Sequence, residues 1–395
     1  MSEMFYVTGV ELRRIFAVRA AFSAMILAVL IYAVLYPQPY LAETLRDVPI
    51  AVVDQDRSTA SQDLLRRIDA TEMVEIAQSA PDMVAAQRLL FERQVYGILV
   101  IPQDFERSLL RGSPAPVALY GDASYFLMYQ RIAGGVSAVT RTVGAEVEAG
   151  RLIASGIDPT LAAAAGDPMP VVAVPLFNPQ GGYATYLLPA AFVLILQQTL
   201  MMAVGLLGTA GSAGMTAATS QRVRAAGALG TVIGKTLAYL VIQSVLFTFC
   251  TIVLPALYGI PRLGNPLDIL AVGLPFVLAV SLLGQACAVI LKRGEIVQLV
   301  LIAVGLPFFF LSGFSWPTSA MPQAIVWIAQ LVPSTSAIEA LVRVGQMGAP
   351  LSAVKTETLT LWALVVLYGS LAVLFEYRRG GRLLAAAEPV AASNP

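Results

Sequence analysis

The clearest chemical signature in the sequence is Ile233-Gly234-Lys235-Thr236, which matches the end of a phosphate-binding loop. Such a loop requires Gly-x4-Gly-Lys-Ser/Thr after a strand, because its backbone amides and its lysine surround phosphate groups. The first glycine would occupy position 229, which is Leu229, and the stretch begins an apolar helix. We therefore expect no nucleotide site here, and we expect Lys235 to extend its ammonium toward a membrane surface.

Three aspartates, Asp54, Asp56 and Asp122, each follow a predicted strand, where α/β folds usually bind ligands. A metal or another ligand could bind these carboxylates. The alternative, which we favour, is that they cap helices and form turns, because aspartate is a preferred residue for both. The sequence contains no histidine, so the commonest general base and metal ligand is missing. We expect no catalytic residue and no metal site.

Glu339 and Arg343 stand four residues apart, which places them on one face of a helix. They follow a proline-rich stretch, so they form either an interfacial ion pair or a lock on a gate. Six residues before them are further candidates for an outer hairpin or gate. These are Ser312, Gly313, Trp316, Pro317, Pro322 and Pro333.

Five glutamines lie inside apolar runs: Gln197, Gln198, Gln243, Gln285 and Gln298. Amides in a membrane either hydrogen-bond neighbouring helices, which we favour, or line a pathway. An ion-coupled pump usually carries ionisable groups at depth, but Asp268 and Glu295 lie only at the ends of runs. This pattern favours an external energy source. Cys250 and Cys287 also lie in apolar runs, where we expect them to act as small apolar side chains.

These residues need a membrane-embedded scaffold, because 57% of the 395 residues are hydrophobic and only 13% are charged. Soluble domains carry about 25% charged residues. A net charge of zero gives no indication of nucleic-acid binding. Six runs reach the length of about 20 residues that a spanning helix needs. They are residues 16–36, 183–209, 237–258, 267–291, 296–314 and 359–375, of which Pro275 is expected to break the fourth.

Basic residues near the ends of the runs predict the orientation. With the N-terminus inside, eleven lie on the inner side: Arg13, Arg14, Arg19, Arg222, Arg224, Lys235, Lys292, Arg293, Arg378, Arg379 and Arg382. The short outer loops hold only Arg262, Arg343 and Lys355. Both termini are therefore predicted to be cytoplasmic. Tyr-Pro-Gln-Pro-Tyr follows the first run in place of a small-residue cleavage site, so we expect this run to remain as an anchor.

Residues 38–178 would lie outside, with eleven arginines, seventeen acidic residues and a net charge of −6. Strand patterns at 48–53, 73–77, 96–101 and 117–120 alternate with helical patterns, and Ser58 is placed to cap the first helix. This order predicts an α/β domain with a partly parallel sheet. The predicted fold is thus an α-helical polytopic membrane protein with six transmembrane helices and an extracytoplasmic α/β domain between helices 1 and 2. The predicted divisions are 1–37, 38–178, 179–380 with a re-entrant outer hairpin at 315–335, and a cytoplasmic tail at 381–395.

Three stretches together resemble the bacterial ABC-2 type transporter permeases, in the branch with a large extracytoplasmic domain after the first helix. The first joins Val52-Val53-Asp54-Gln55-Asp56-Arg57-Ser58 with Tyr96-Gly97-Ile98-Leu99-Val100-Ile101-Pro102-Gln103-Asp104-Phe105. The second joins Leu311-Ser312-Gly313-Phe314-Ser315-Trp316-Pro317 with Met321-Pro322. The third is Leu331-Val332-Pro333-Ser334-Thr335 followed by Glu339 and Arg343.

The resemblance implies a permease subunit of an exporter that moves a hydrophobic or amphipathic substrate, drug-like or lipid-like, out across the inner membrane. A separate cytoplasmic ATPase would bind ATP and magnesium, so this chain would need no cofactor of its own. Two permease chains would pair, and a periplasmic membrane-fusion adaptor is a further implied partner. The loop at 210–235 would contact the ATPase through Arg222, Arg224, Gly230, Thr231 and Lys235.

That loop differs from the family pattern, because residues 220–231 contain no acidic residue. This difference favours a paralogous partner permease, while an identical partner stays open. A different class of protein is the main alternative: a membrane-anchored binding or sensor module with the 38–178 domain as receptor. Six spans argue against that alternative, since a sensor needs only one or two. The sequence leaves the substrate and the role of the extracytoplasmic domain open.

Overall fold

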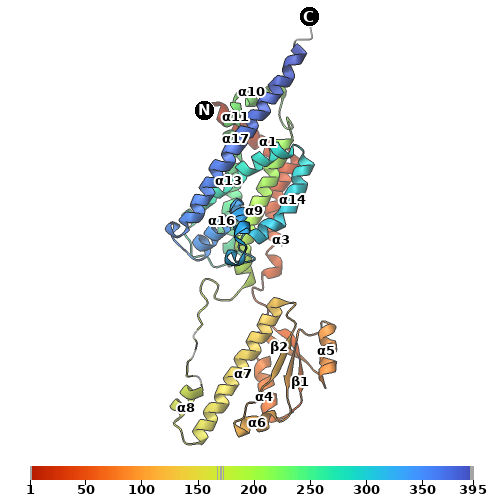
Figure 1. The fold of residues 1–395 in the computed structure, drawn as a ribbon, viewed down its shortest axis with the longest axis vertical. Coiled ribbons are helices and arrows are strands. Elements are labelled where there is room, and N and C mark those ends of the chain that lie inside the picture. The colour runs from red at the N-terminus through yellow and green to blue at the C-terminus, as the bar shows by residue number, and fades with distance from the viewer. Residues whose placement is uncertain (1, 167, 170, 172, 392–395) are drawn as a thin grey trace. The chain divides into compact units, whose positions relative to one another are not determined.

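The computed structural model describes residues 2–166, 168, 169, 171 and 173–391, so the predicted tail 381–395 lies partly outside it, at 392–395. The chain divides into two compact units (Figure 1). A helical unit comprises Met1–Glu43 and Pro175–Pro395, and an α/β unit comprises Thr44–Val174. The α/β unit is therefore an insertion into the helical one.

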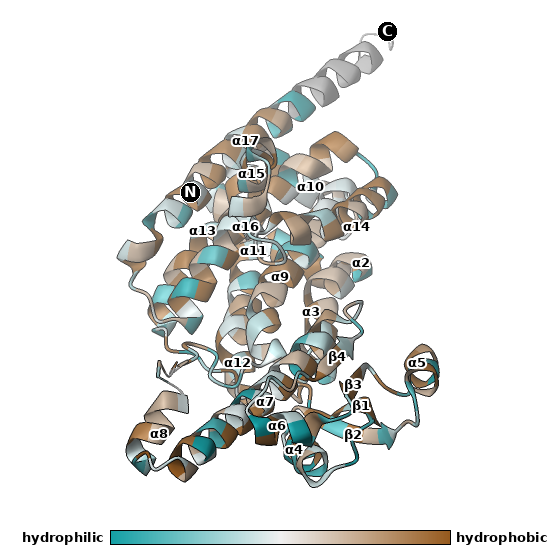
Figure 2. Ribbon diagram, turned by 60° about the horizontal axis from the view of Figure 1, so that its bottom comes forward, coloured by the Kyte–Doolittle hydropathy of each residue, from teal (hydrophilic) through white to brown (hydrophobic). Residues whose placement is uncertain are grey.

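Six helices of the described part of the chain are long and apolar enough to cross a membrane, which confirms the predicted number. The spans are Arg19–Tyr40, Tyr183–Thr209, Gly227–Leu257, Pro266–Leu291, Gly294–Leu311 and Leu351–Arg379. Hydrophobic residues, brown in Figure 2, extend along these helices. The predicted break at Pro275 is wrong, because α13 (Pro266–Leu291) continues through this residue. Membrane helices tolerate proline where neighbouring groups satisfy the carbonyl that loses its amide partner.

The remaining spans are built from the following elements. The first span contains α2 (Arg19–Phe22), η1 (Ser23–Leu27), α3 (Ala28–Leu35) and η2 (Gln38–Tyr40), and the second is α9 (Tyr183–Thr209). The third contains α11 (Gly227–Thr248), η3 (Phe249–Val253) and α12 (Leu254–Leu257). The fifth is α14 (Gly294–Leu311), and the sixth contains η6 (Leu351–Val354) and most of α17 (Lys355–Ala391). The structure adds a separate amphipathic helix before the first span, α1 (Ser2–Ala17), which the sequence analysis did not predict. A short helix, α10 (Ala217–Ala225), stands between the second and third spans.

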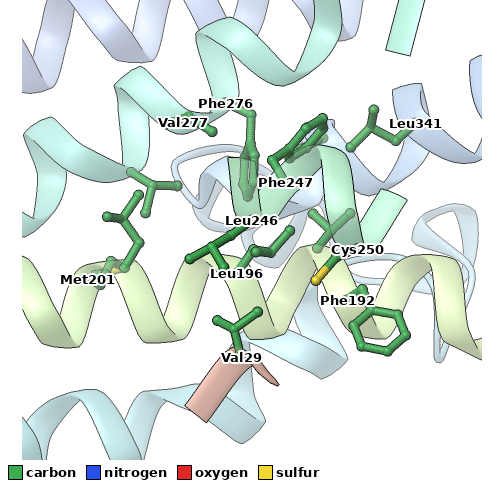
Figure 3. Packing of buried hydrophobic residues seen from close by; sticks show 14 of the residues in the cluster. Val29, Phe192, Leu196, Met201, Leu246, Phe247, Cys250, Phe276, Val277 and Leu341 are labelled. Carbon is green, nitrogen blue, oxygen red and sulfur yellow. The ribbon is translucent and has the colours of Figure 1, made fainter. Parts of the chain in front are cut away.

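Helix α9 forms the centre of the helical unit, with 78% of its most apolar stretch buried against other helices. Its Leu196 packs among Leu246 and Phe247 of α11 and Phe276 of α13 (Figure 3). In contrast, only 11% of the α14 stretch is buried. One helix is thus surrounded by protein, while α14 leaves most of its apolar surface free within the single chain.

Two helices after the fifth span are bent by 88° relative to each other. The first is α15 (Gln323–Gln330), and the second is α16 (Pro333–Leu341), which continues into the π turn η5 (Val342–Gln346). This geometry fits either a broken span or a re-entrant loop. Pro333 occupies the first turn of α16, where its missing amide would have no intrahelical partner. The helix that it begins extends beyond residue 335, the predicted end of the hairpin.

The α/β unit contains a four-stranded sheet in the order β2-β1-β3-β4. The strands are β1 (Val48–Asp54), β2 (Val74–Ser79), β3 (Gly97–Ile101) and β4 (Ala118–Gly121). β1 pairs in parallel with β2 and β3, whereas β3 pairs antiparallel with β4. The predicted partly parallel sheet is therefore confirmed.

Both faces of this sheet are covered. The helices of the α/β unit are α4 (Thr59–Asp69), α5 (Met83–Phe91), α6 (Phe105–Arg111), α7 (Phe126–Ala154) and α8 (Pro159–Gly166), of which α8 packs on α7. Ile50 belongs to a core with Ile68 of α4 and Ile132 of α7, whereas Val53 packs in a second core with Ala86 of α5. Burial on both faces explains why β1 is almost continuously apolar.

Candidate functional site

The predicted contact loop, residues 210–235, contains the helix α10 together with the beginning of α11. Thr216 caps α10, since its hydroxyl accepts a hydrogen bond from the Thr219 amide at 3.2 Å. Thr231 of α11 donates to the Val223 carbonyl of α10 at 3.2 Å. The loop is therefore a folded element that is fastened to the third span.

The helix α1 packs against α10 through Arg222. The Arg222 guanidinium lies 3.2 Å from the Glu3 carboxylate and 4.0 Å from the centre of the Tyr6 ring. The hydrogen bond to Glu3 raises the pKa of Arg222 above its ordinary value. These contacts are at the surface, where water and salt screen an ion pair and it adds little to stability. They orient α10 relative to α1 more than they stabilise the fold.

Gly234, the residue that suggested a phosphate loop, has a packing role. A Cβ atom at this position would lie 2.7 Å from Val7 Cβ and 2.8 Å from the Met4 carbonyl oxygen. The Thr8 hydroxyl donates to the Gly234 carbonyl at 3.0 Å. Glycine here lets α1 and α11 approach each other closely.

One turn further along α1, Glu11 and Arg14 form a buried ion pair. Their charged atoms are 2.7 Å apart and each side chain is 3% exposed. The Tyr239 hydroxyl of α11 donates to the second Glu11 oxygen at 2.5 Å. Because buried charges need several hydrogen bonds to offset their lost hydration, this pair and Tyr239 form one unit that joins α1 to α11.

The same Arg14 side chain also holds the end of α9. Its guanidinium donates to the carbonyls of Leu207, Gly211 and Ala213, each at 3.1 Å. The last carbonyls of a helix lack intrahelical partners and carry partial negative charge, which a cation stabilises. Arg14 therefore binds the end of α9 and the segment that leads into α10. We call Glu11, Arg14 and Tyr239 the buried junction.

The other predicted loop residues have different surroundings. Arg224 is exposed and makes no hydrogen bond or ion pair within the described residues. Gly230 lies in the first turn of α11, with Ala226 as its close neighbour. Lys235 is half-buried beside a cavity of about 20 Å³ that Glu376 and Arg379 of α17 also line. Among the cationic residues of the set, Arg224 is the one that is exposed and also makes no ion pair within the part of the chain that the structure describes.

The candidate gate pair has an additional partner. Arg343 lies 3.9 Å from Glu339, as the i, i+4 spacing predicts, but it lies 2.9 Å from Glu357 of α17. Arg343 belongs to the π turn η5, which widens the helix and turns the side chain away from the ordinary α-helical position. Spacing along the sequence gave no signal for Glu357. The stronger contact ties the bent pair to the last span.

The remaining hairpin candidates are spread over the surface and the core. Ser312 and Pro333 are buried, whereas Trp316 is 58% exposed. Gly313 has a φ of +78°, which favours glycine, and it forms the turn after α14. Pro317 and Pro322 directly precede short helical turns. Gly313, Pro317 and Pro322 shape the chain path at these turns, and a role of the six residues in a gate stays a prediction.

The five glutamines do not converge. Gln197 accepts from the Ser334 amide at 2.8 Å, and Gln243 donates to the Leu196 carbonyl at 3.2 Å. Gln285 donates to Thr236 at 2.8 Å, and Gln198 donates to the Leu301 carbonyl. Four of them thus join neighbouring helices. Gln298 alone is exposed, on the apolar surface of α14.

The three aspartates of the α/β unit serve caps and turns. Asp54 accepts from the amides of Asp56 and Arg57, at 3.1 and 2.9 Å, and Asp56 accepts from the Glu106 amide at 3.0 Å. Asp122 accepts from Ser124 and Arg93. Within the described residues no group of three metal-binding side chains was found. These hydrogen bonds are those of turns and caps, which the sequence analysis favoured as the role of the three carboxylates.

The buried junction was missed because Arg14 was interpreted only as a topology signal. Glu11, an acidic residue between apolar neighbours and next to a cluster of arginines, was the available clue. The family model described as "ABC-2 family transporter protein" matches residues 19–374, a range that begins after α1. No curated protein sequence matches the chain.

Proposed function

Because the chain belongs to the ABC-2 family of transporter proteins, we propose that it is the permease of a bacterial ABC exporter. It is a multi-pass membrane protein, and permeases of this family lack an ATPase domain and generally pair with an ABC ATPase. In our proposal the chain moves a hydrophobic or amphipathic substrate outward across the inner membrane. A separate ATPase binds ATP and magnesium and supplies the energy.

The observation that carries this proposal is the connection of α10 to three membrane-associated helices. α10 touches α1 through Arg222 and α11 through Thr231. The chain segment before it is held by Arg14, together with the end of α9. A force applied to α10 would therefore reach the central helix α9 through a connected set of contacts, as energy coupling between sites requires.

The proposed membrane orientation is supported by the charges and by the order of the spans. One span, α9, separates α10 from the α/β unit along the chain, and in our proposal the two face opposite sides of the membrane. The eleven basic residues near span ends on the α10 side make that side cytoplasmic. Both termini are then cytoplasmic and the α/β unit is periplasmic.

The class of substrate is supported by a groove of about 770 Å³ between α11, α13 and α17. Its lining residues are Leu229, Val232, Ile233, Thr236, Leu237, Leu278, Leu282, Val365, Val366, Gly369, Ser370, Val373, Leu374 and Tyr377. A polar substrate would lose its hydration on entering these walls without gaining hydrogen bonds. A drug-like or lipid-like molecule would bury its apolar part there.

A second permease chain is supported by the exposed face of α14. Gln298 places an amide on a helix that is otherwise apolar and mostly unburied. An amide that faces lipid lacks hydrogen-bond partners, whereas the same amide at a helix interface finds them. We propose that an identical or paralogous permease covers this face.

The periplasmic role of the α/β unit is supported by its exposed aromatic and aliphatic side chains. Phe91 is 79% exposed, Leu110 is 81% exposed and Phe126 is 64% exposed. Scattered apolar residues are common on surfaces, but side chains of this size are suitable contacts for a membrane-fusion adaptor. In this proposal the unit binds such an adaptor or guides the substrate across the periplasm.

The decisive experiment is purification of the tagged chain from its native membrane in mild detergent, followed by identification of the bound polypeptides. We expect a stoichiometric ABC ATPase and ATP hydrolysis by the complex. Co-expression of an untagged copy of the same chain with the tagged chain would distinguish an identical partner permease from a paralogous one. Purification without any ATPase, together with specific ligand binding by the α/β unit, would support the sensor alternative instead.

A further inference from the structure

A second cavity, of about 380 Å³, lies where the ends of α9, α13 and α17 meet. Gly208 and Thr209 contribute from the end of α9, and Lys292 contributes from the end of α13. Arg378 and Arg379 contribute from α17. This volume falls in the range of small-molecule sites, and none of the interactions described above uses the cavity as a whole.

The cavity is strongly cationic. Three of its nine lining residues are basic and none is acidic, while Glu376 lies 3.9 Å from Arg379. Arg379 also donates to the Gly208 carbonyl at 3.4 Å. Lys292 and Arg378 are exposed and make no ion pair within the described residues. The pocket therefore has a net positive charge that only an anionic ligand would balance.

Lys292 has a backbone conformation that glycine usually adopts. Its φ is +58°, at the left-handed residue that ends α13. Most helices with such an end carry glycine there, because a Cβ atom disfavours the conformation. A lysine at this position directs a cation to the rim of the cavity at a cost in backbone energy.

The rest of the lining is apolar. Ala288, Val289 and Ile290 of α13 and Phe375 of α17 face the same space. A free anion such as inorganic phosphate would make no use of this apolar lining. A phospholipid would, because it presents a phosphate and acyl chains next to each other. Basic pockets between the ends of membrane helices suit anionic head groups for this reason.

We propose that this pocket binds the head group of an anionic phospholipid, with its acyl chains along Val289, Ile290 and Phe375. The phosphate group lies between Lys292 and Arg378, while Arg379 joins it to the end of α9. The lipid thereby ties α13 and α17 to the helix end that the buried junction holds from the other side. This inference is independent of the direction of transport and of the ATPase.

The test is native mass spectrometry of the purified full-length chain with phosphatidylglycerol or phosphatidylcholine added in equal amounts. We expect retained phosphatidylglycerol on the wild-type chain, and at least about 20-fold weaker retention after Lys292→Gln with Arg378→Gln. The matched control is Arg13→Gln with Arg19→Gln, which removes two exposed cations outside the cavity. This control is expected to retain phosphatidylglycerol as the wild-type chain does.

Equal loss of lipid in the pocket variant and the control would show a diffuse charge effect and overturn the proposal. Equal retention of phosphatidylcholine by the wild-type chain would overturn the requirement for an anion. Displacement of the lipid by millimolar inorganic phosphate would identify a phosphate site in place of a lipid site. If the double variant does not fold, as judged by thermal unfolding, Arg378→Gln alone is compared with Arg13→Gln by the same measurement.

Discussion

The guanidinium of Arg14 lies 2.7 Å from the carboxylate of Glu11, and both side chains are almost completely buried. The pair sits where α1, α9 and α11 meet, because Arg14 also binds carbonyls at the end of α9 and Glu11 also accepts from Tyr239. Two buried charges of this kind depend on each other, since either one alone would remain desolvated and unpaired. The contact therefore connects the amphipathic first helix to the centre of the bundle.

The first prediction concerns this pair. Arg14→Gln should lower the free energy of unfolding by about 3–5 kcal/mol, because it leaves the Glu11 carboxylate buried without a cation. Glu11→Gln should cost less, since Arg14 keeps three backbone carbonyls. Combining both changes should cost clearly less than the sum of the two single changes. Thermal unfolding of the detergent-solubilised variants measures this, and additive effects would show that the two charges do not depend on each other.

The second prediction concerns topology. In a background with Cys250→Ser and Cys287→Ser, we introduce Ser79→Cys in the α/β unit or Ser212→Cys beside α10, both at exposed positions. An impermeant thiol reagent, added to cells with a permeabilised outer membrane, should label residue 79 and leave residue 212 unmodified. Disruption of the inner membrane should make both positions reactive. The opposite labelling pattern would reverse the proposed orientation.

The third prediction is that Lys235 has no role in nucleotide binding. Lys235 lies within α11, beside Tyr239 and near Glu376, and Gly234 before it is in contact with α1. The purified chain without a partner should show no saturable ATP binding, and Lys235→Ala should not change that result. Saturable ATP binding that Lys235→Ala abolishes would contradict this interpretation.

Local patterns were sufficient for much of the fold. The strand at 48–53 was predictable because it is buried on both faces, and the cap at Ser58 is present, with its hydroxyl accepting from the Ser61 amide at 3.1 Å. The spans followed from apolar length alone. The predicted third span began too late, because Lys235 interrupts the apolar run. The helix α11 begins at Gly227, ten residues before the predicted start, and it includes Lys235.

The candidate site was less predictable, because its contacts join residues that are far apart in the chain. Arg14 and Leu207, or Arg343 and Glu357, are brought together only by the packing of whole helices. The same limitation applied to Gln298, whose exposure depends on α14 lying at the edge of the unit. Sequence spacing found pairs within one helix and could not find pairs between helices.

The fourth prediction concerns acid stability of the α/β unit. Hydrogen bonds from the Ser58 side chain and the Glu106 backbone lower the pKa of Asp56 below the ordinary value of about 3.9. A lowered pKa in the folded state means that the carboxylate stabilises the fold above about pH 4, and that this contribution is lost as the pH falls through the folded pKa. Asp56→Asn should therefore weaken protection of α6 at pH 7, and its effect should shrink as the pH falls through the lowered pKa of the folded state. Amide hydrogen exchange of the full chain, corrected for intrinsic rates, measures this, and an effect that grows toward low pH would contradict the sign.

The fifth prediction separates two arginines of α10. Arg222 is engaged by Glu3 and Tyr6, whereas Arg224 is exposed and without an ion pair in the described part of the chain. A docking surface for an ATPase needs free multi-donor groups, and arginine supplies them. Arg224→Gln should therefore reduce ATPase co-purification and export, while Arg222→Gln should act more weakly, by loosening α10 from α1.

The double variant Arg222→Gln with Arg224→Gln should lose ATPase stimulation and export, yet insert normally, because nine of the eleven inner cations remain. Export and bound ATPase are measured at matched membrane levels, with Arg13→Gln as a control that removes an exposed inner charge outside α10. Unchanged values for the double variant would show that the two arginines set topology only, and that the force on α9 enters through another contact.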